Sequence, residues 1–360
     1  MPEEILDELA ELGQSVWIDD IGRAMLEDGT LKALIGRGLR GMTSNPSIFE
    51  KAIRESPAYD ASIKELAGSG EGPRRIYDAL TIADIRTAAD LFLPVHERSG
   101  GLDGWVSLEV SPELARDTSG TIAEAARLHR AVGRPNVMIK IPATKEGFPA
   151  IEETLAAGIS VNVTLIFSLA QYMKAAEAYK RGMGRLAGAG KPAGSVRSVA
   201  SVFVSRVDTA VDGLLREKGA PKELLGTAAV ANAARIYGKY LELFGGDGGA
   251  QRVLWGSTST KDPVYSELKY VEELIGRGTV NTVPGKTLAA FLERGRCAEA
   301  LAPESSRGAE EALKKLADAG ADLDAVCARL LEDGLKTFSG AFAALLAALT
   351  AKAAALSREN

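Results

Sequence analysis

Short runs of β-branched and aliphatic residues alternate with longer amphipathic segments along most of the chain. Eight runs have the length and the valine and isoleucine content of strands, at residues 15–19, 40–45, 105–110, 136–141, 160–166, 198–204, 252–256 and 279–283. Between them, apolar residues recur at the i, i+3, i+4 spacing of helices, as in 117–133 and 168–184. Asp117 and Ser168 are the predicted N-caps of those two helices. Strands that alternate with helices predict parallel βα units.

The number of these units favours one closed architecture. A closed (β/α)8 TIM barrel of about 250 residues matches both their count and their combined length. An open doubly wound sheet is the alternative, but no GxGxxG follows the first strand in residues 17–26. From about residue 300 the sequence has helical patterns and no strand pattern. We therefore expect a single domain over residues 1–360, with a helical C-terminal extension packed on the barrel.

Composition narrows the functional classes. The 360 residues are 46% hydrophobic and 25% charged, and the net charge is −5. These values are typical of a globular protein and argue against a broad nucleic-acid surface. Cys297 and Cys327 lie far apart, and no Cys/His cluster occurs, so neither a disulfide framework nor a metal site is expected. Neither GK pair has the P-loop spacing. We expect no metal and no cofactor.

Location follows from the lack of a targeting pattern. The N-terminal residues 1–12 are acidic and have no apolar core, unlike a signal peptide. The most apolar stretch, residues 342–356, is interrupted by Thr350 and Lys352 and is too short for a bilayer. We expect a cytoplasmic protein without a membrane partner.

Polar residues occupy strand positions that should face the barrel interior. In residues 137–141, Val137, Ile139 and Ile141 alternate with Met138 and Lys140. Since alternate side chains point to opposite faces, the aliphatic set faces the helices and Lys140 points inward. The same alternation predicts further inward polar side chains, namely Asp19, Ser107, Glu109, Asn162 and Thr164.

An interior lysine among carboxylates has two interpretations. It can be a structural ion pair, with Lys140 held by Glu109 or Asp19 in the core. Alternatively, it lies at the open C-terminal end of the barrel, where active sites occur. Burial disfavours the charged ammonium form of a lysine, which leaves an amine able to form a Schiff base with a carbonyl. Nearby carboxylates can then move the protons. This is class I aldolase chemistry.

Six segments, in this order, resemble the transaldolase family in its longer bacterial form: 15–22, 41–53, 106–118, 137–144, 159–172 and 201–208. The most specific pieces are TSNPS, IKIPAT and NVTLIFS. The resemblance covers roughly residues 14–290. It implies a (β/α)8 barrel that transfers a dihydroxyacetone unit in the non-oxidative pentose phosphate pathway. Sedoheptulose 7-phosphate and glyceraldehyde 3-phosphate would give erythrose 4-phosphate and fructose 6-phosphate.

The resemblance also implies catalytic roles. Lys140 of IKIPAT matches the Schiff-base lysine, and Asp19 matches the aspartate that deprotonates the C4 hydroxyl during cleavage. Asp20 is the alternative if the strand register shifts by one residue. Glu109 and Thr164 match the pair that positions a catalytic water.

The resemblance assigns substrate contacts to four further residues. Asn45 of TSNPS and Asn162 match substrate-binding asparagines. Ser201 matches a hydroxyl-binding serine and Arg206 a phosphate-binding arginine, whose guanidinium fork suits phosphate oxygens. A second phosphate-binding arginine is common in the family, but residues 256–262 read GSTSTKD. Lys261 is the candidate there, and a solvated loop lysine is the alternative interpretation.

Two other functions are compatible with such a barrel. An aldolase on the same scaffold would release the three-carbon unit to water, as a fructose 6-phosphate aldolase does. A non-enzymatic barrel that binds sugar phosphates would need no interior lysine. In each case the partners are small-molecule sugar phosphates, without nucleic acid, and we expect a monomer or a homodimer.

Overall fold

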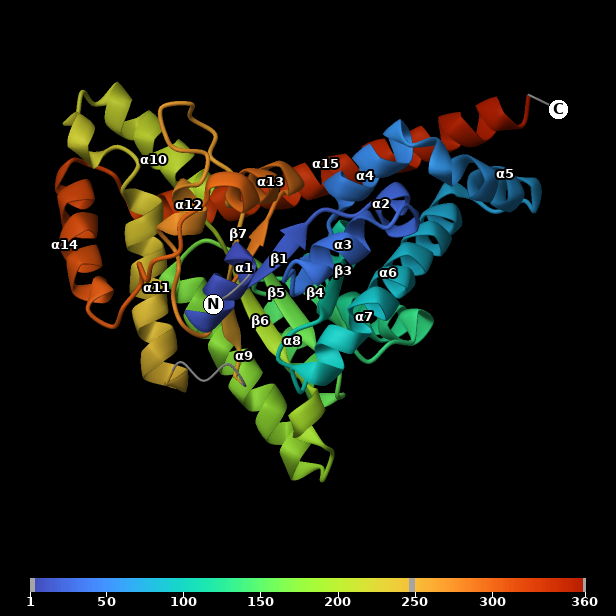
Figure 1. Cartoon of the computed structure of the whole chain (residues 1–360), viewed down its shortest axis with the longest axis horizontal. Coiled ribbons are helices and arrows are strands. Elements are labelled where there is room, and N and C mark those ends of the chain that lie inside the picture. The colour runs from blue at the N-terminus through green and yellow to red at the C-terminus, as the bar shows by residue number, and fades with distance from the viewer. Residues whose placement is uncertain (1–3, 246–249, 359–360) are drawn as a thin grey trace.

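The computed structural model describes residues 4–245 and 250–358. In these ranges, eight parallel strands close into a barrel in sequence order, which confirms the predicted (β/α)8 fold (Figure 1). The strands are β1 (Gln14–Asp19), β2 (Gly41–Thr43), β3 (Trp105–Glu109), β4 (Val137–Pro142), β5 (Val161–Ile166), β6 (Ser198–Phe203), β7 (Arg252–Gly256) and β8 (Thr279–Val283).

Helices surround this barrel (Figure 1). Those before β5 are α1 (Ile5–Glu11), α2 (Arg23–Glu27), α3 (Thr30–Gly36), α4 (Pro46–Glu55), α5 (Asp60–Gly68), α6 (Pro73–Arg98), α7 (Thr118–Val132) and α8 (Gly147–Ala156). Those after it are α9 (Leu169–Gly188), α10 (Ser205–Glu217), α11 (Ala228–Phe244), α12 (Lys269–Glu272), α13 (Gly285–Arg294), α14 (Ser305–Asp318) and α15 (Leu323–Leu356). Short 3-10 turns span Pro57–Tyr59, Pro112–Leu114, Ala193–Ser195 and Lys222–Leu224.

Both predicted helix caps are present. The Asp117 side chain accepts from Gly120 N at the start of α7, at 2.9 Å. The Ser168 hydroxyl accepts a hydrogen bond from Gln171 N at 3.1 Å. In return, Gln171 Oε1 accepts a hydrogen bond from Ser168 N. This reciprocal pair is a capping box, so the start of α9, and with it the end of β5, is fixed locally.

The lower part of the barrel interior is an apolar plug. It is formed by the inward residues Trp17, Trp105, Met138, Val199, Leu254 and Val280. The Trp17 ring leaves no room for a side chain at position 41 of β2, because a Cβ on Gly41 would lie 2.6 Å from it. Beneath this layer, Arg252 pairs with Asp103 at 2.9 Å. The N-terminal end of the barrel is therefore closed, and only the C-terminal end can open to a ligand.

The C-terminal extension predicted from about residue 300 consists of α14 and α15. Helix α14 packs on α11, and α15 crosses the barrel to pack on α4, α5, α6 and α10 (Figure 1). Lys352 anchors the far end of α15, donating to Ile53 O and Ser56 O at 2.9 Å each and pairing with Asp60. Helix α15, which is remote in sequence from the strands, thus lies across the C-terminal end of the barrel.

By length and hydropathy alone, α15 is long and apolar enough to cross a membrane. Among the described residues, one helix, α15, meets this criterion. From the sequence alone, we expect the apolar stretch 342–356 to be too short for a bilayer. This expectation is wrong about length, because the stretch belongs to a helix of 34 residues that begins at Leu323. Length and composition do not distinguish a membrane span from a long helix packed on a barrel. In the structure, Leu330, Phe338, Phe342 and Leu345 of α15 are buried.

Candidate active site

Lys140 lies inside the barrel at the upper end of β4. Its neighbours Ile139 and Ile141 belong to the hydrophobic layer between strands and helices, as the alternation predicts. The side chain is almost fully buried, at 4% exposure. Its Nζ donates to Ser44 O at 2.8 Å and lies 3.4 Å from Glu109 Oε2. The amine is therefore held in place by a carbonyl and a carboxylate.

Glu109 ends β3, directly beside Lys140 in the strand register. Burial raises the pKa of the Glu109 carboxyl to about 6, and the positive charge of Lys140 limits the rise. A carboxyl with such a pKa can both give and accept a proton near neutral pH. The pair therefore combines a buried amine with a group suited to proton transfer.

Asp19 ends β1 on the same interior surface. Burial raises its pKa, while Lys140 and a hydrogen bond from Thr43 act in the opposite direction. Thr43 donates to Asp19 Oδ1 at 2.6 Å. Thr43 Oγ1 also lies 2.7 Å from Thr282 Oγ1, so Thr282 is the donor in that contact, since a hydroxyl has one proton. Asp20 lines a different cavity on the outer side of the barrel, with Met25 and Leu288.

One cavity of about 150 Å³ opens at the C-terminal end of the barrel. We call it the mouth cavity. The predicted site residues on its wall are Asp19, Asn45, Lys140, Thr164, Ser201, Arg206 and Lys261. The structure therefore brings together residues from six separate segments of the chain.

Glu109 and Asn162 are not on the wall of the mouth cavity. Asn162 is fully buried below it, where it accepts from Ser201 Oγ at 2.6 Å and donates to Ser107 Oγ at 3.1 Å. Its amide orients the Ser201 hydroxyl from beneath. Glu109 reaches Lys140 from the side and lines a neighbouring cavity.

Asn45 has a structural task besides any contact with a ligand. Its Oδ1 accepts from Ile48 N at 3.1 Å and caps α4, whose first residue is Pro46. This hydrogen bond fixes the side chain at the cavity wall. The amide nitrogen of Asn45 is the group that remains to donate to a ligand.

The outer end of the mouth cavity carries two cations. Arg206 lies in the first turn of α10, and burial lowers its pKa. Lys261 is largely exposed in the loop after β7, yet partial desolvation and the charge of Arg206 both lower its pKa. Lys261 Nζ donates to Ser259 Oγ at 2.9 Å. Within the described ranges, neither cation has a carboxylate partner, an arrangement typical of an anion site.

Several residues at the site were not predicted. The alternation used for the other strands also places Thr43 and Thr282 inward, in residues 41–43 and 279–283, and would have found both. The backbone oxygen of Ser44, which accepts a hydrogen bond from Lys140, could not be predicted from a side-chain pattern. Phe203 and Phe338 are the aromatic residues on the wall of the mouth cavity. Phe338 comes from α15, and nothing in its local sequence indicates contact with the barrel mouth.

Two residues near the mouth cavity have backbone conformations that non-glycine residues rarely adopt. Leu165 follows Thr164 on β5 with φ of 58°, and Ser257 follows β7 with φ of 54°. The β5–β6 register shifts at the same point as Leu165. Gln171 Nε2 supports the carbonyl of Leu165 at 3.1 Å. Backbone strain of this kind concentrates at functional sites.

Comparison with known proteins agrees with this geometry. The family model for transaldolase/fructose-6-phosphate aldolase matches residues 16–349. A transaldolase of Thiobacillus denitrificans is 47% identical over 358 residues, covering 95% of this chain and 99% of the relative. A transaldolase of Neisseria gonorrhoeae is 44% identical over 96% of this chain and 99% of its own. Transaldolase 1 of Streptomyces coelicolor is 44% identical over 96% of this chain and 94% of its own. The chain belongs to the transaldolase/fructose-6-phosphate aldolase family.

Proposed function

We propose that this enzyme is a transaldolase that moves a dihydroxyacetone unit between sugar phosphates through a Schiff base on Lys140. The observation that carries the proposal is the position of the Lys140 amine. It is almost fully buried beside the Glu109 carboxylate, on the wall of a cavity that also includes Asp19. The outer end of this cavity holds two cations that have no carboxylate partner among the described residues. A buried amine suits attack on a carbonyl, and the cations suit a phosphate.

Schiff-base formation uses Lys140 with Glu109. The amine attacks the C2 carbonyl of the ketose and gives a carbinolamine. Glu109 then protonates the departing hydroxyl, which leaves as water. Thr164 supports this step, because its Oγ1 is buried and has no hydrogen-bond partner among the described residues. A buried hydroxyl of this kind is available to a water molecule or a substrate.

Cleavage uses Asp19. Its carboxylate takes the proton of the C4 hydroxyl, the C3–C4 bond breaks, and the electron pair is delocalised into the iminium. The raised pKa of Asp19 favours acceptance of this proton. The hydrogen bond from Thr43 fixes the orientation of the carboxylate. The aldose then leaves, and the reverse steps with another aldose complete the transfer.

Substrate binding uses the rest of the mouth cavity. Arg206 and Lys261 bind the phosphate at the outer end. The Asn45 amide donates to a sugar hydroxyl, and Ser201 Oγ, whose own proton goes to Asn162 Oδ1, accepts from one. These residues lie on the same wall as Lys140, so a phosphorylated ketose can reach the amine while its phosphate contacts the cations. The substrates that fit are small sugar phosphates.

An assay with a donor, with and without an acceptor, tests the proposal. With fructose 6-phosphate and erythrose 4-phosphate, the enzyme should form sedoheptulose 7-phosphate and glyceraldehyde 3-phosphate. With fructose 6-phosphate alone, it should release little free dihydroxyacetone. Rapid release of dihydroxyacetone without an acceptor would instead identify the aldolase alternative. The absence of both products would reject class I aldolase chemistry on this scaffold.

We also propose that residues 1–360 act as one domain in the cytoplasm. Residues 1–3, 246–249 and 359–360 of this range lie outside the described residues. The support for a single unit is that α15 contributes Phe338 to the mouth cavity. Cell fractionation tests the location, since this proposal expects the enzyme in the soluble fraction despite the apolar α15.

A further inference from the structure

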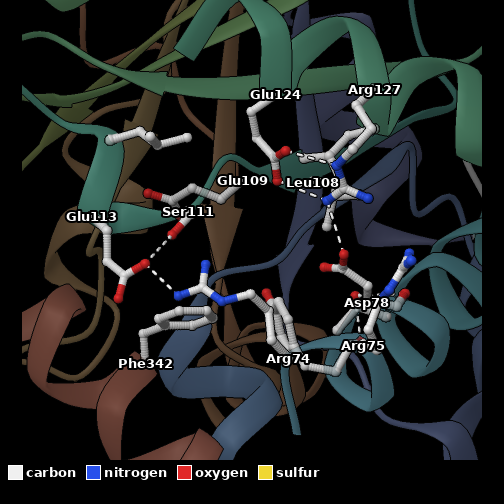
Figure 2. Close-up of a pocket in the computed structure, with 14 residues that line it drawn as sticks. Arg74, Arg75, Asp78, Leu108, Glu109, Ser111, Glu113, Glu124, Arg127 and Phe342 are labelled. Atoms are coloured by element: carbon white, nitrogen blue, oxygen red, sulfur yellow. Dashed lines mark hydrogen bonds and ion pairs between the residues drawn. The ribbon is translucent and has the colours of Figure 1, made fainter. Parts of the chain in front are cut away.

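A second cavity lies behind Glu109, away from the mouth cavity. It has a volume of about 260 Å³ and is enclosed by the end of β3, α6, α7 and α15 (Figure 2). Its wall runs from the exposed side chains of Arg74 and Glu113 to the buried carboxyl of Glu109. We call it the side cavity. It connects the protein surface to the carboxyl without passing through the mouth cavity.

The two cavities meet at one contact. Lys140 lines the mouth cavity but not the side cavity. Glu109 lines the side cavity but not the mouth cavity. The 3.4 Å contact between Lys140 Nζ and Glu109 Oε2 therefore joins them. Glu109 Oε2 is buried and makes no hydrogen bond to any residue that the structure describes. The carboxyl thus has the amine on one side and the side cavity on the other.

Most charges around the side cavity are paired, although Arg75 on its wall has no ion-pair partner among the described residues. Arg127 pairs with Glu124 at 2.7 Å and with Asp78 at 3.0 Å, and Figure 2 shows these bonds on one side of the cavity. On the other side, Arg74 pairs with Glu113 at 2.5 Å, and its guanidinium lies over the Phe342 ring. Charges of both signs line the cavity, so the wall does not select an anion or a cation. A polar passage of this kind is suited to water.

We propose that the side cavity is a separate entrance for water and protons that serves Glu109 during Schiff-base formation and hydrolysis. The inference rests on the proposed function. In formation, the carbinolamine C–O bond breaks, the nitrogen lone pair forms the C=N bond, and the oxygen leaves as water with a proton from Glu109. In hydrolysis, a water oxygen attacks the iminium carbon, its proton passes to Glu109, and the C=N electron pair returns to nitrogen. The carbinolamine then loses its hydroxyl proton, the C2 carbonyl re-forms, and the C–N bond breaks to release the Lys140 amine, which takes up a proton.

The geometry explains why a second entrance is useful. The mouth cavity is small, about 150 Å³, and it holds the sugar when the water is released. Phe338 of α15 also covers part of its wall. Water formed beside Glu109 can leave through the side cavity while the sugar chain remains in place. It follows that the water that hydrolyses the imine comes from bulk solvent and is not the molecule first released.

Oxygen labelling tests this consequence. Fructose 6-phosphate labelled with ¹⁸O at C2 is mixed with enzyme and erythrose 4-phosphate, and the reaction is quenched within one turnover. The C2 oxygen of the sedoheptulose 7-phosphate formed is then analysed by mass spectrometry. If released water exchanges with solvent, the product of the wild-type enzyme carries almost no ¹⁸O.

A variant that fills the side cavity should retain the label. Ser111 lies on the cavity wall, where its hydroxyl donates to Glu113. In Ser111→Met the longer side chain occupies the passage, and ¹⁸O retention in the product should rise several-fold with the KM for fructose 6-phosphate unchanged. Ser119→Met is the matched control, because Ser119 also donates to a carboxylate two residues away, Asp117, but is exposed and outside the cavity. If Ser111→Met does not fold, Leu128→Phe fills the cavity from α7.

The outcomes separate this inference from the proposed function. Equal, low retention in wild type, the filled variant and the control would overturn the separate entrance while leaving the Schiff base intact. Full retention in the wild-type product would also overturn it, because released water would then stay in the site. If no sedoheptulose 7-phosphate forms at all, the proposed function itself fails.

Discussion

The upper and lower layers of the barrel interior come from the same strands but differ in the polarity of their side chains. Inward positions two residues apart carry apolar side chains below and polar ones above. On β1, β4 and β6 the pairs are Trp17 and Asp19, Met138 and Lys140, and Val199 and Ser201. The backbone geometry is shared, so the difference lies entirely in the side chains and in their distance from the open end of the barrel.

The comparison shows how stability and chemistry are divided within one interior. The lower layer buries large apolar side chains, each worth about 1.5–3 kcal/mol. The upper layer buries the ionisable groups of Lys140, Glu109 and Asp19. The pKa values of the two carboxyls are raised because burial disfavours their charged forms. We therefore expect substitutions above to impair chemistry and substitutions below to impair stability.

The largest effect on activity should come from Lys140→Met. Without the amine no Schiff base forms, so transfer activity should be abolished. Methionine packs at position 138 one layer below, and replacing a buried charge by an apolar side chain is often neutral or stabilising. Transfer assays and thermal unfolding measure both properties. Activity near the wild-type level would contradict the division between layers.

Asp19→Ala should lower kcat by about 10²–10⁴-fold, the usual contribution of an acid–base residue. Schiff-base formation should remain, because cleavage is the later step. Asp20→Ala is the matched control, since Asp20 faces a cavity outside the barrel, and its effect on kcat should be small. An inactive Asp20→Ala enzyme beside an active Asp19→Ala enzyme would contradict the assignment.

Met138→Ala tests the lower layer. The substitution removes part of the apolar plug, and the free energy of unfolding should fall by about 2–5 kcal/mol. Denaturant titration measures this loss. At temperatures where the variant is folded, kcat should stay close to that of the wild type. A large fall in kcat with unchanged stability would show that the two layers are not separable.

Arg206→Ala should have the smallest of these effects. A hydrogen bond to a charged group contributes about 1.5–3 kcal/mol, so the KM for fructose 6-phosphate should rise about ten- to a hundredfold. The KM for unphosphorylated dihydroxyacetone should change little. Lys261→Ala should raise the KM less, because Lys261 is more exposed. Equal losses for phosphorylated and unphosphorylated donors would indicate a structural role for Arg206.

The barrel itself could be predicted from sequence because its signals are local. Valine-rich runs give the strands, and strict alternation on β4 places Lys140 inward. The alternation also separates Asp19 from Asp20. Even the N-caps Asp117 and Ser168 follow from residues within one helical turn.

The remaining features depend on contacts between distant segments. Helix α15 lies across the barrel through contacts with α4, α5 and α6, far away in sequence, so the place of Phe338 in the mouth cavity has no local signal. Strand alternation places Glu109 inward but does not show that it lines the side cavity. Likewise, only the side-chain hydrogen bonds within the closed barrel reveal that Asn162 lies beneath the cavity, between Ser107 and Ser201.

Borohydride trapping tests the central claim, that Lys140 is the nucleophile of the upper layer, most directly. Enzyme is incubated with fructose 6-phosphate, reduced with borohydride, digested and analysed by peptide mass mapping. We predict a stable dihydroxyacetone-derived adduct on the peptide that contains Lys140, and no adduct in Lys140→Met. An adduct on a different lysine, or no adduct in an enzyme that transfers the three-carbon unit, would contradict the account.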